Sequence, residues 1–291
     1  LMGLIDYETM NELRLDLLDI SEKIIVYGEG WNMYSSKLTD RMAHMTNKRP
    51  ILTIGFFNDT FRESTKGTTF HVKEKGYTTG NMKTIDKVKE MLLGSARNRY
   101  IFKYSSQSIN YVECHDNLTF FDKCLYLTDD LELIKKEELL ATSMVILAQG
   151  VPFIHSGQEF FRTKDLDENS YSSGDDVNKL DWQRRVEHES EINFVRKLIE
   201  LRKNLNCFKL KADSDLEAKA EVISLASNSI MMHYNDVCNL LIVFKPLKTE
   251  ETIAIPSEYQ LILSSTDADF KDQEYTLTDI GTYIFAKKGS N

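Results

Sequence analysis

Residues 109–117 read INYVECHDN and form the most informative stretch of the chain. The first half is β-branched and aromatic, as in a buried strand. The second half presents a carboxylate, an imidazole and an amide where that strand ends. Residues 24–31, IIVYGEGW, repeat the arrangement, with Glu29 and Trp31 after an apolar run. The two stretches predict carboxylates at the ends of two strands of one sheet.

Up to about residue 206 the chain alternates apolar strand segments with amphipathic helices. The predicted strands are residues 24–27, 51–57, 109–113 and 151–155. The predicted helices are residues 6–20, 84–94, 131–149 and 189–204. Continuous apolar strands separated by helices indicate a parallel sheet covered on both faces. We therefore predict an α/β domain over residues 1–206, with four β/α units, about half of an eight-stranded barrel.

From residue 207 the apolar pattern has a period of two, with short turns between segments. The predicted strands are residues 222–225, 230–234, 239–244, 251–255, 260–264, 275–278 and 282–286. Alternation of this kind is typical of antiparallel strands with one buried face. The spacing predicts an all-β antiparallel sandwich domain over residues 207–291.

Composition limits the possible partners. The chain has 291 residues, of which 42% are hydrophobic, and a net charge of -9. It can therefore bury a substantial core, and no basic patch offsets the acidic balance. This argues against nucleic acid and favours neutral or weakly polar ligands. No apolar stretch approaches the roughly 20 residues that span a membrane, so no membrane partner is expected.

The four cysteines lie far apart in sequence and form no Cys-x-x-Cys pair: Cys114, Cys124, Cys207 and Cys238. Disulfides or a metal cluster are alternatives, but free thiols of a cytoplasmic protein fit this usage better. The chain opens at Leu1 without a start Met or a charged leader region. We expect a cytoplasmic protein. A secreted or cell-surface protein is the alternative, because the true N-terminus would then lie upstream.

Glu29 and Trp31 are the first candidate site residues. A carboxylate between two glycines just past a buried strand is suited to general acid catalysis. The indole of Trp31 offers a flat face to a sugar ring. The alternative is an exposed loop Glu beside a core Trp.

His115, Asp116 and Asn117 are the second candidate group. They can hydrogen-bond adjacent sugar hydroxyls and stabilise a positively charged, oxocarbenium-like transition state. A single His is more often structural, which is the alternative here. Metal binding needs more ligands than this stretch offers, so no metal site is predicted.

Polar groups also follow the other two strands. Asp59 and Arg62 come after the second strand, where helix capping by Asn58 or Asp59 is the alternative and is sufficient to explain the acidic and amide residues. The long polar loop after the fourth strand contains Tyr171 and Asp175, and a solvated charged loop is the alternative there. All four strand ends thus carry sugar-compatible groups on the rim where barrels hold their active sites.

These motifs resemble the alpha-amylase superfamily, glycoside hydrolase family 13, and within it the type I pullulanases. Residues 28–31 are similar to the strand-five motif with the general acid/base, and residues 111–117 to the strand-seven motif with its His-Asp pair. Residues 56–67 resemble the strand-six region, and residues 151–171 the strand-eight loop. The resemblance covers about residues 1–206.

The resemblance implies the C-terminal half of a (β/α)8 TIM barrel, strands five to eight, followed by the β-sandwich. In type I pullulanases Leu-Met-Gly follows directly after the nucleophilic Asp. The opening Leu1-Met2-Gly3 therefore leads us to expect that Asp one residue before Leu1, and the fragment is expected to be inactive alone. Cys114 stands where Ser is common, a difference that leaves the carboxylate and the imidazole in place.

The implied activity is retaining hydrolysis of α-1,6-glucosidic linkages in pullulan, amylopectin and related α-glucans. Glu29 would be the acid/base, and Asp116 and His115 would hold the distorted sugar. The residues expected to line neighbouring subsites are Trp31, Asp59, Arg62, Asn117, Tyr171 and Asp175. No cofactor is expected, and calcium binding stays open.

Two alternatives remain: an isoamylase or glycogen-debranching relative, and a non-catalytic α-glucan-binding fragment. The expected partners are an α-glucan polysaccharide or oligosaccharide, together with the missing N-terminal half of the barrel. Self-association through exposed strand edges is the other expected contact.

Overall fold

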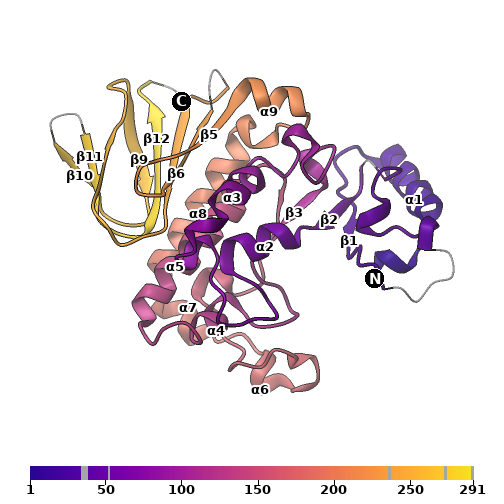
Figure 1. Cartoon of the computed structure of the whole chain (residues 1–291). Helices are drawn as coiled ribbons and strands as arrows, with labels where there is room; N and C mark the ends of the chain where they lie inside the picture. The colour runs from indigo at the N-terminus through magenta and orange to yellow at the C-terminus, as the bar shows by residue number, and fades with distance from the viewer. Residues whose placement is uncertain (34–38, 52, 235–236, 272–273, 290–291) are drawn as a thin grey trace.

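The computed structural model describes residues 1–33, 39–51, 53–234, 237–271 and 274–289. The chain starts beside a short parallel sheet, continues through a layer of helices and ends in antiparallel sheets on the far side (Figure 1). The fold is therefore mixed α/β, with parallel and antiparallel strands in separate sheets.

The parallel sheet has four strands in the order β1 (Tyr27–Gly28), β2 (Gly55–Phe57), β3 (Ser108–Asn110) and β4 (Val151–Pro152). All three pairings are parallel. The predicted strands are present in the predicted order, but each is shorter. Residues 111–113 are buried beyond the paired part of β3. Tyr111 and Val112 are therefore buried by packing and not by pairing in the strand ladder.

The helices come from the expected segments, with additions: α1 (Tyr7–Ile20), α2 (Asp59–Lys66), α3 (Ile85–Leu92), α4 (Phe120–Cys124), α5 (Leu131–Leu147), α6 (Asp175–Asn178), α7 (Trp182–Glu187), α8 (Glu189–Asn204) and α9 (Asp213–Lys219). Single-turn 3-10 helices cover Met2–Leu4, Thr39–Arg41, Met45–Asn47, Tyr77–Thr79, Met82–Thr84, Arg97–Arg99, Ser105–Gln107, Gln158–Phe160, Ser170–Ser172 and Asn206–Lys209. Asp6 caps α1 by accepting from the main-chain nitrogen of Thr9, as its position predicts. Asn58 caps α2 through Phe61, so the capping interpretation of Asn58 is correct.

Two antiparallel sheets follow. The five-stranded sheet has the order β5 (Ala220–Ser224), β6 (Ile230–Tyr234), β7 (Leu240–Lys245), β12 (Gly281–Lys287) and β9 (Tyr259–Ser264). The three-stranded sheet has the order β10 (Asp269–Lys271), β11 (Glu274–Leu277) and β8 (Glu251–Ala254). Each predicted strand corresponds to one of these. The prediction missed β10, whose three residues are all exposed and contain one apolar residue, Phe270, too few to show a period of two.

The five-stranded sheet is covered on both faces. One face meets the three-stranded sheet through a core that includes Val243, Tyr283 and Phe285. On the other face Ile242 and Phe244 belong to the large core that also contains the helix residues of α3, α5 and α8. Strand β7 is buried at all six positions for this reason, and its first five residues, from Leu240 to Phe244, form a continuous apolar run. The segments predicted as two domains therefore share a core.

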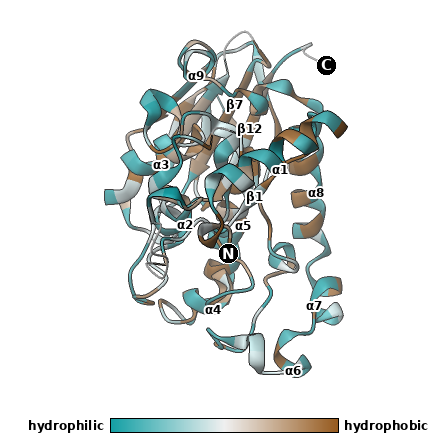
Figure 2. Cartoon of the chain, turned by 90° about the vertical axis from the view of Figure 1, so that its right-hand side faces the viewer, coloured by the Kyte–Doolittle hydropathy of each residue, from teal (hydrophilic) through white to brown (hydrophobic). Residues whose placement is uncertain are grey.

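Apolar side chains are exposed around α1 and β1. The exposed fractions are 45% for Leu13, 62% for Leu15, 75% for Ile20 and 59% for Ile25. Figure 2 shows hydrophobic residues interspersed with hydrophilic ones along α1. Within the described residues β1 and β4 each pair on one side only. Among those residues, no helix has the length and apolar character needed to cross a membrane.

Candidate active site

A cleft of about 480 Å³ opens beside the ends of β1, β2 and β3. Seven of the nine predicted site residues line it: Glu29, Trp31, Asp59, Arg62, His115, Asp116 and Asn117. The lining is completed by Leu1, Gly28, Phe57, Phe70, Tyr111, Cys114 and Phe153. Strand ends far apart in sequence thus deliver their polar groups to one cavity.

Glu29, His115 and Asp116 lie together. One side-chain ligand atom from each falls within 4.8 Å of the others. The His115 Nε2 to Asp116 Oδ1 distance is 3.4 Å, and the two side chains are 77% and 58% exposed. Glu29 is less open, with 29% of its side chain exposed. Two carboxylates and an imidazole, carried by the segments after β1 and β3, can therefore contact the same part of a bound ligand.

The same three groups are the only set of this kind found among the described residues, and they could in principle ligate a metal ion. Residues 115–117 alone supply too few ligands, and Glu29 joins them only through the fold. Exposed carboxylates beside a His also suit hydrogen bonding to sugar hydroxyls and stabilisation of positive charge.

Close packing of glycines positions the Glu29 segment. A Cβ atom on Gly30 would lie 2.4 Å from Cδ1 of the buried Phe56. A Cβ atom on Gly3 would lie 2.1 Å from the main-chain oxygen of Trp31. The main-chain nitrogen of Gly3 also donates to the main-chain oxygen of Glu29 at 2.9 Å. Only glycine allows both approaches, which gives a steric reason for Gly30 in the Gly-Glu-Gly-Trp motif and for Gly3 against Trp31.

Asp59 and Arg62 form one polar unit with Tyr111. The Tyr111 hydroxyl donates to Oδ1 of Asp59, and Nη2 of Arg62 lies 3.1 Å from the same oxygen. Burial raises the pKa of Asp59, and the charge of Arg62 opposes that shift. The Arg62 guanidinium also lies 5.3 Å from the Tyr111 ring centroid. Asp59 is therefore tied to its neighbours and keeps one oxygen for a ligand.

Aromatic side chains form much of the cleft wall. The Phe57 ring centroid is 5.1 Å from those of Tyr111 and Phe153, in edge-to-face contacts. Phe70 lines the cleft with 82% of the residue exposed. The sequence prediction missed Phe70, because a single Phe in the polar stretch after α2 has no strand or helix periodicity.

Two predicted residues do not join the cleft. Tyr171 lies in the 3-10 helix Ser170–Ser172 and is 84% exposed, and Asp175 is the first residue of α6. Neither lines the cavity. Their loop lies beyond α4 and α7, as Figure 1 shows.

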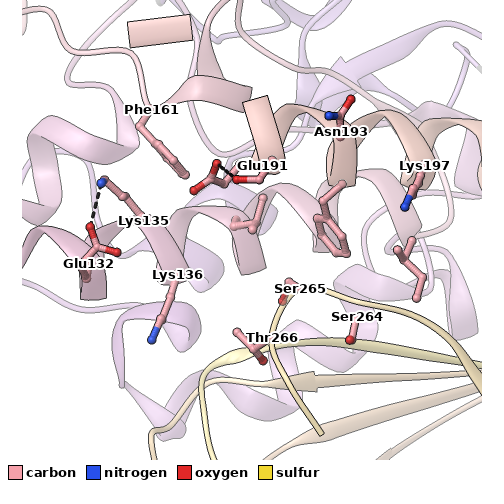
Figure 3. Close-up of a pocket in the computed structure, with 14 residues that line it drawn as sticks. Glu132, Lys135, Lys136, Phe161, Glu191, Asn193, Lys197, Ser264, Ser265 and Thr266 are labelled. Carbon is pink, nitrogen blue, oxygen red and sulfur yellow. Dashed lines mark hydrogen bonds and ion pairs between the residues drawn. The ribbon is translucent and has the colours of Figure 1, made fainter. Parts of the chain in front are cut away.

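A second cavity of about 350 Å³ lies between α5, α8 and residues 263–266 (Figure 3). Two of its lysines are already paired: Lys135 with Glu132 at 2.8 Å, and Lys136 with Asp279 at 2.5 Å. Its phenylalanines Phe161 and Phe194 are 1% and 8% exposed, which leaves little ring surface for a ligand. None of the predicted site residues lines it.

All four cysteines are free thiols, as predicted. Burial raises the pKa of Cys114, which limits its reactivity in the cleft.

The chain is similar in sequence to curated pullulanases. It is 39% identical over 242 residues to the pullulanase of Bacillus subtilis (strain 168), an alignment that covers 81% of this chain and 34% of the relative. It is 31% identical over 209 residues to the chloroplastic pullulanase 1 of Arabidopsis thaliana, which covers 55% of this chain and 22% of the relative. The chain thus spans about a third or less of these relatives. No family model matches it.

Solved pullulanase structures share the fold. The structure of the Anoxybacillus sp. LM18-11 pullulanase complexed with maltotetraose superposes with a TM-score of 0.91 and 31% identity, over 99% of this chain and 43% of that one. The type I pullulanase of Bacillus subtilis str. 168 complexed with maltose superposes with a TM-score of 0.87 and 33% identity, over 99% of this chain and 43% of that one. The Paenibacillus barengoltzii pullulanase in complex with maltohexaose and alpha-cyclodextrin superposes with a TM-score of 0.90 and 31% identity, over 99% of this chain and 47% of that one.

Proposed function

Because this chain is a homologue of the pullulanases of the alpha-amylase family, we propose that it forms the α-glucan site of a debranching glycoside hydrolase. In this proposal residues 1–206 are the C-terminal half of a (β/α)8 barrel, and residues 207–291 are a β-sandwich. The reaction is retaining hydrolysis of α-1,6-glucosidic linkages in pullulan, amylopectin and related glucans.

One observation carries the proposal: Glu29, His115 and Asp116 meet at the ends of separate strands. In the proposed mechanism Glu29 protonates the leaving glycosidic oxygen and later activates water. Asp116 and His115 hold the distorted sugar and stabilise the positive charge that develops on it. Trp31, Asp59, Arg62 and Asn117 bind neighbouring glucose units.

The surroundings of Leu1 support a nucleophile from upstream. The main-chain nitrogen of Leu1 lies 3.6 Å from Oε2 of Glu29, and Leu1 lines the cleft. A residue joined to Leu1 would therefore enter the site beside the proposed acid/base. The motif resemblance assigns the nucleophilic Asp to this position. The proposal accordingly expects residues 1–291 alone to bind α-glucans but not to hydrolyse them.

Ligand binding by residues 1–291 tests this assignment. The chain has two tryptophans, Trp31 in the cleft and Trp182, which is 63% exposed. In a Trp182→Phe background the fluorescence reports Trp31 alone. We expect maltotetraose to change this signal in a saturable way and cellotetraose, with β-linkages, to leave it unchanged.

An additional Asp116→Asn substitution should weaken the response to maltotetraose. No response in the parent variant, or an equal response to both sugars, would contradict an α-glucan site. An isoamylase-like or glycogen-debranching specificity would bind maltotetraose but show a different preference among branched substrates.

A further inference from the structure

Two buried lysines donate hydrogen bonds to the main chain on either side of Asn117. Nζ of Lys164 lies 2.8 Å from the His115 oxygen, and Nζ of Lys66 lies 3.3 Å from the Leu118 oxygen. We infer that Lys164 and Lys66 are positioning residues that set the place of His115 and Asp116 in the cleft. The inference rests on the proposed function for its role in binding, but its geometry is independent of that role.

The loop that carries His115 and Asp116 is open to solvent, and within it the Cys114 thiol lies 3.7 Å from the main-chain oxygen of Asp116. His115 and Asp116 are 77% and 58% exposed, and their side chains contact each other at 3.4 Å. Asn117 has φ 61°, in the left-handed region that residues with a side chain seldom adopt, although Asn does so more readily than most. An exposed loop with a residue in this region needs contacts from outside, and the two lysines supply them to its main chain.

Lys164 is itself held in place. It is 1% exposed, and its main-chain nitrogen donates to Oδ2 of Asp122 at 2.7 Å. The hydroxyl of Thr163 donates to the other oxygen of Asp122, which is fully buried in α4. Asp122 of α4 therefore fixes the position of Lys164. The Lys164 ammonium in turn fixes the position of the His115 carbonyl.

Lys66 is the last residue of α2 and is 2% exposed. Burial lowers its pKa to about 8, and the negative charge of Glu113 opposes the shift. Burial lowers the pKa of Lys164 as well, opposed by Asp122, Cys114 and Glu113. Both ammonium groups thus depend on acidic partners beneath the loop.

Glu113 is the acid that faces both lysines. It is 1% exposed, its Oε2 accepts from the Phe120 nitrogen at 2.5 Å, and its Oε1 lies 2.9 Å from Nδ1 of His155. Nε2 of His155 in turn lies 3.1 Å from Nη1 of Arg162. A buried network of charged residues therefore holds residues 113–120 on their core side. The side chains of His115 and Asp116 stay accessible to a ligand.

The test uses Cys114 as a local reporter. Its thiol is partly exposed and lies next to His115, whereas Cys124 and Cys207 are buried. Alkylation by iodoacetamide, followed residue by residue with mass spectrometry, measures the accessibility of the loop at Cys114 and of the core at Cys124 and Cys207 in one experiment. We expect Lys164→Met to raise the Cys114 rate several-fold and to leave Cys124 and Cys207 unchanged.

A second measurement connects the loop to binding. In the Trp182→Phe background Lys164→Met should weaken maltotetraose affinity by about tenfold, which corresponds to loss of one charge-assisted hydrogen bond. Lys164→Arg should restore part of the affinity, because it keeps the charge and a donor. Lys203→Met, at an exposed lysine of α8, is the matched control and should change neither reading.

The inference is overturned if Lys164→Met leaves the Cys114 rate at the level of Lys203→Met. It is also overturned if Cys124 and Cys207 become reactive together with Cys114 in both Lys164→Met and Lys66→Met, because the lysines would then support the whole fold. Failure of the parent chain to bind maltotetraose refutes the proposed function instead, and the Cys114 rates still decide the positioning.

Discussion

The hydroxyl of Tyr77 donates to the main-chain oxygen of Phe244 at 3.0 Å and joins the 3-10 helix Tyr77–Thr79 to β7. The main-chain oxygen of Asn228 also lies 3.0 Å from this hydroxyl, so the two carbonyl groups share its single hydrogen. Tyr77 is completely buried, and burial raises its pKa well above the usual value. A neutral phenol therefore links the parallel-sheet part of the chain to the antiparallel sheets across their common core.

Tyr77→Phe should destabilise the whole chain by about 1–2 kcal/mol, because the buried carbonyl of Phe244 and the part-buried carbonyl of Asn228 lose their shared donor. The midpoint of urea unfolding should fall for both parts together, since they share a core. Tyr100→Phe, at a residue that is 46% exposed, is the control and should have little effect. Two separate transitions, with only the second shifted, would mean that the parts unfold independently.

Glu137 makes the stability of the chain depend on pH. Burial raises its pKa from 4.5 to about 7. Between these values the unfolded chain loses the proton while the folded chain keeps it, so stability falls as pH rises through this window. Glu137→Gln removes the effect and should stabilise the chain by about 2–3 kcal/mol at pH 8.

At pH 4 the same substitution should change stability little, because the carboxyl is protonated in both states. Thermal unfolding measured at the two pH values checks the difference. Glu217→Gln, at an exposed position of α9, should show no such pH dependence. A gain of equal size at both pH values would point to packing rather than to the proton.

Gly30→Ala should disturb the cleft through a core contact, because the added methyl would collide with the Phe56 ring. We expect a loss of about 1–3 kcal/mol in unfolding free energy and a weaker response to maltotetraose. Phe56→Leu makes room at the same place. The double variant should therefore be more stable than the sum of the single effects predicts, and strict additivity would exclude the clash.

The proposed catalytic roles can be tested in a chimera in which this chain replaces the matching segment of the Bacillus subtilis pullulanase. The chimera should release reducing sugar from pullulan. Glu29→Gln should lower kcat by about 100-fold or more, because the proton donor is lost while the shape is kept. Asp116→Asn should also lower kcat strongly through lost charge stabilisation.

Glu168→Gln, at an exposed loop position, is the matched substitution and should leave kcat unchanged. If Glu29→Gln or Asp116→Asn kept most of the activity, the assigned roles would be wrong.

Sequence patterns predicted the elements that depend on local periodicity. The bounds of α8 (Glu189–Asn204) and β6 (Ile230–Tyr234) agree with the prediction to the residue. The parallel strands were overestimated, because apolar residues such as Val112 are buried by packing outside the ladder. The shared core was also not predicted, since a strand's alternation does not say what covers its second face.

The candidate site also combines residues that local sequence patterns predict with residues that only the fold brings together. Glu29 and the His115-Asp116 pair were predicted because carboxylates after strands meet at one sheet edge. Phe70 was missed for lack of periodicity. Lys164 carries no signal in a polar loop, and its bond to the His115 oxygen exists only once the two segments are brought together.

The place of the Leu1 nitrogen, 3.6 Å from Oε2 of Glu29, has a practical consequence for labelling. A dye attached there would reside inside the cleft and compete with sugar for the same space. Displacement of such a tethered dye by a free oligosaccharide would report occupancy as a change in fluorescence polarisation. For the same reason, purification tags on residues 1–291 belong at the opposite terminus.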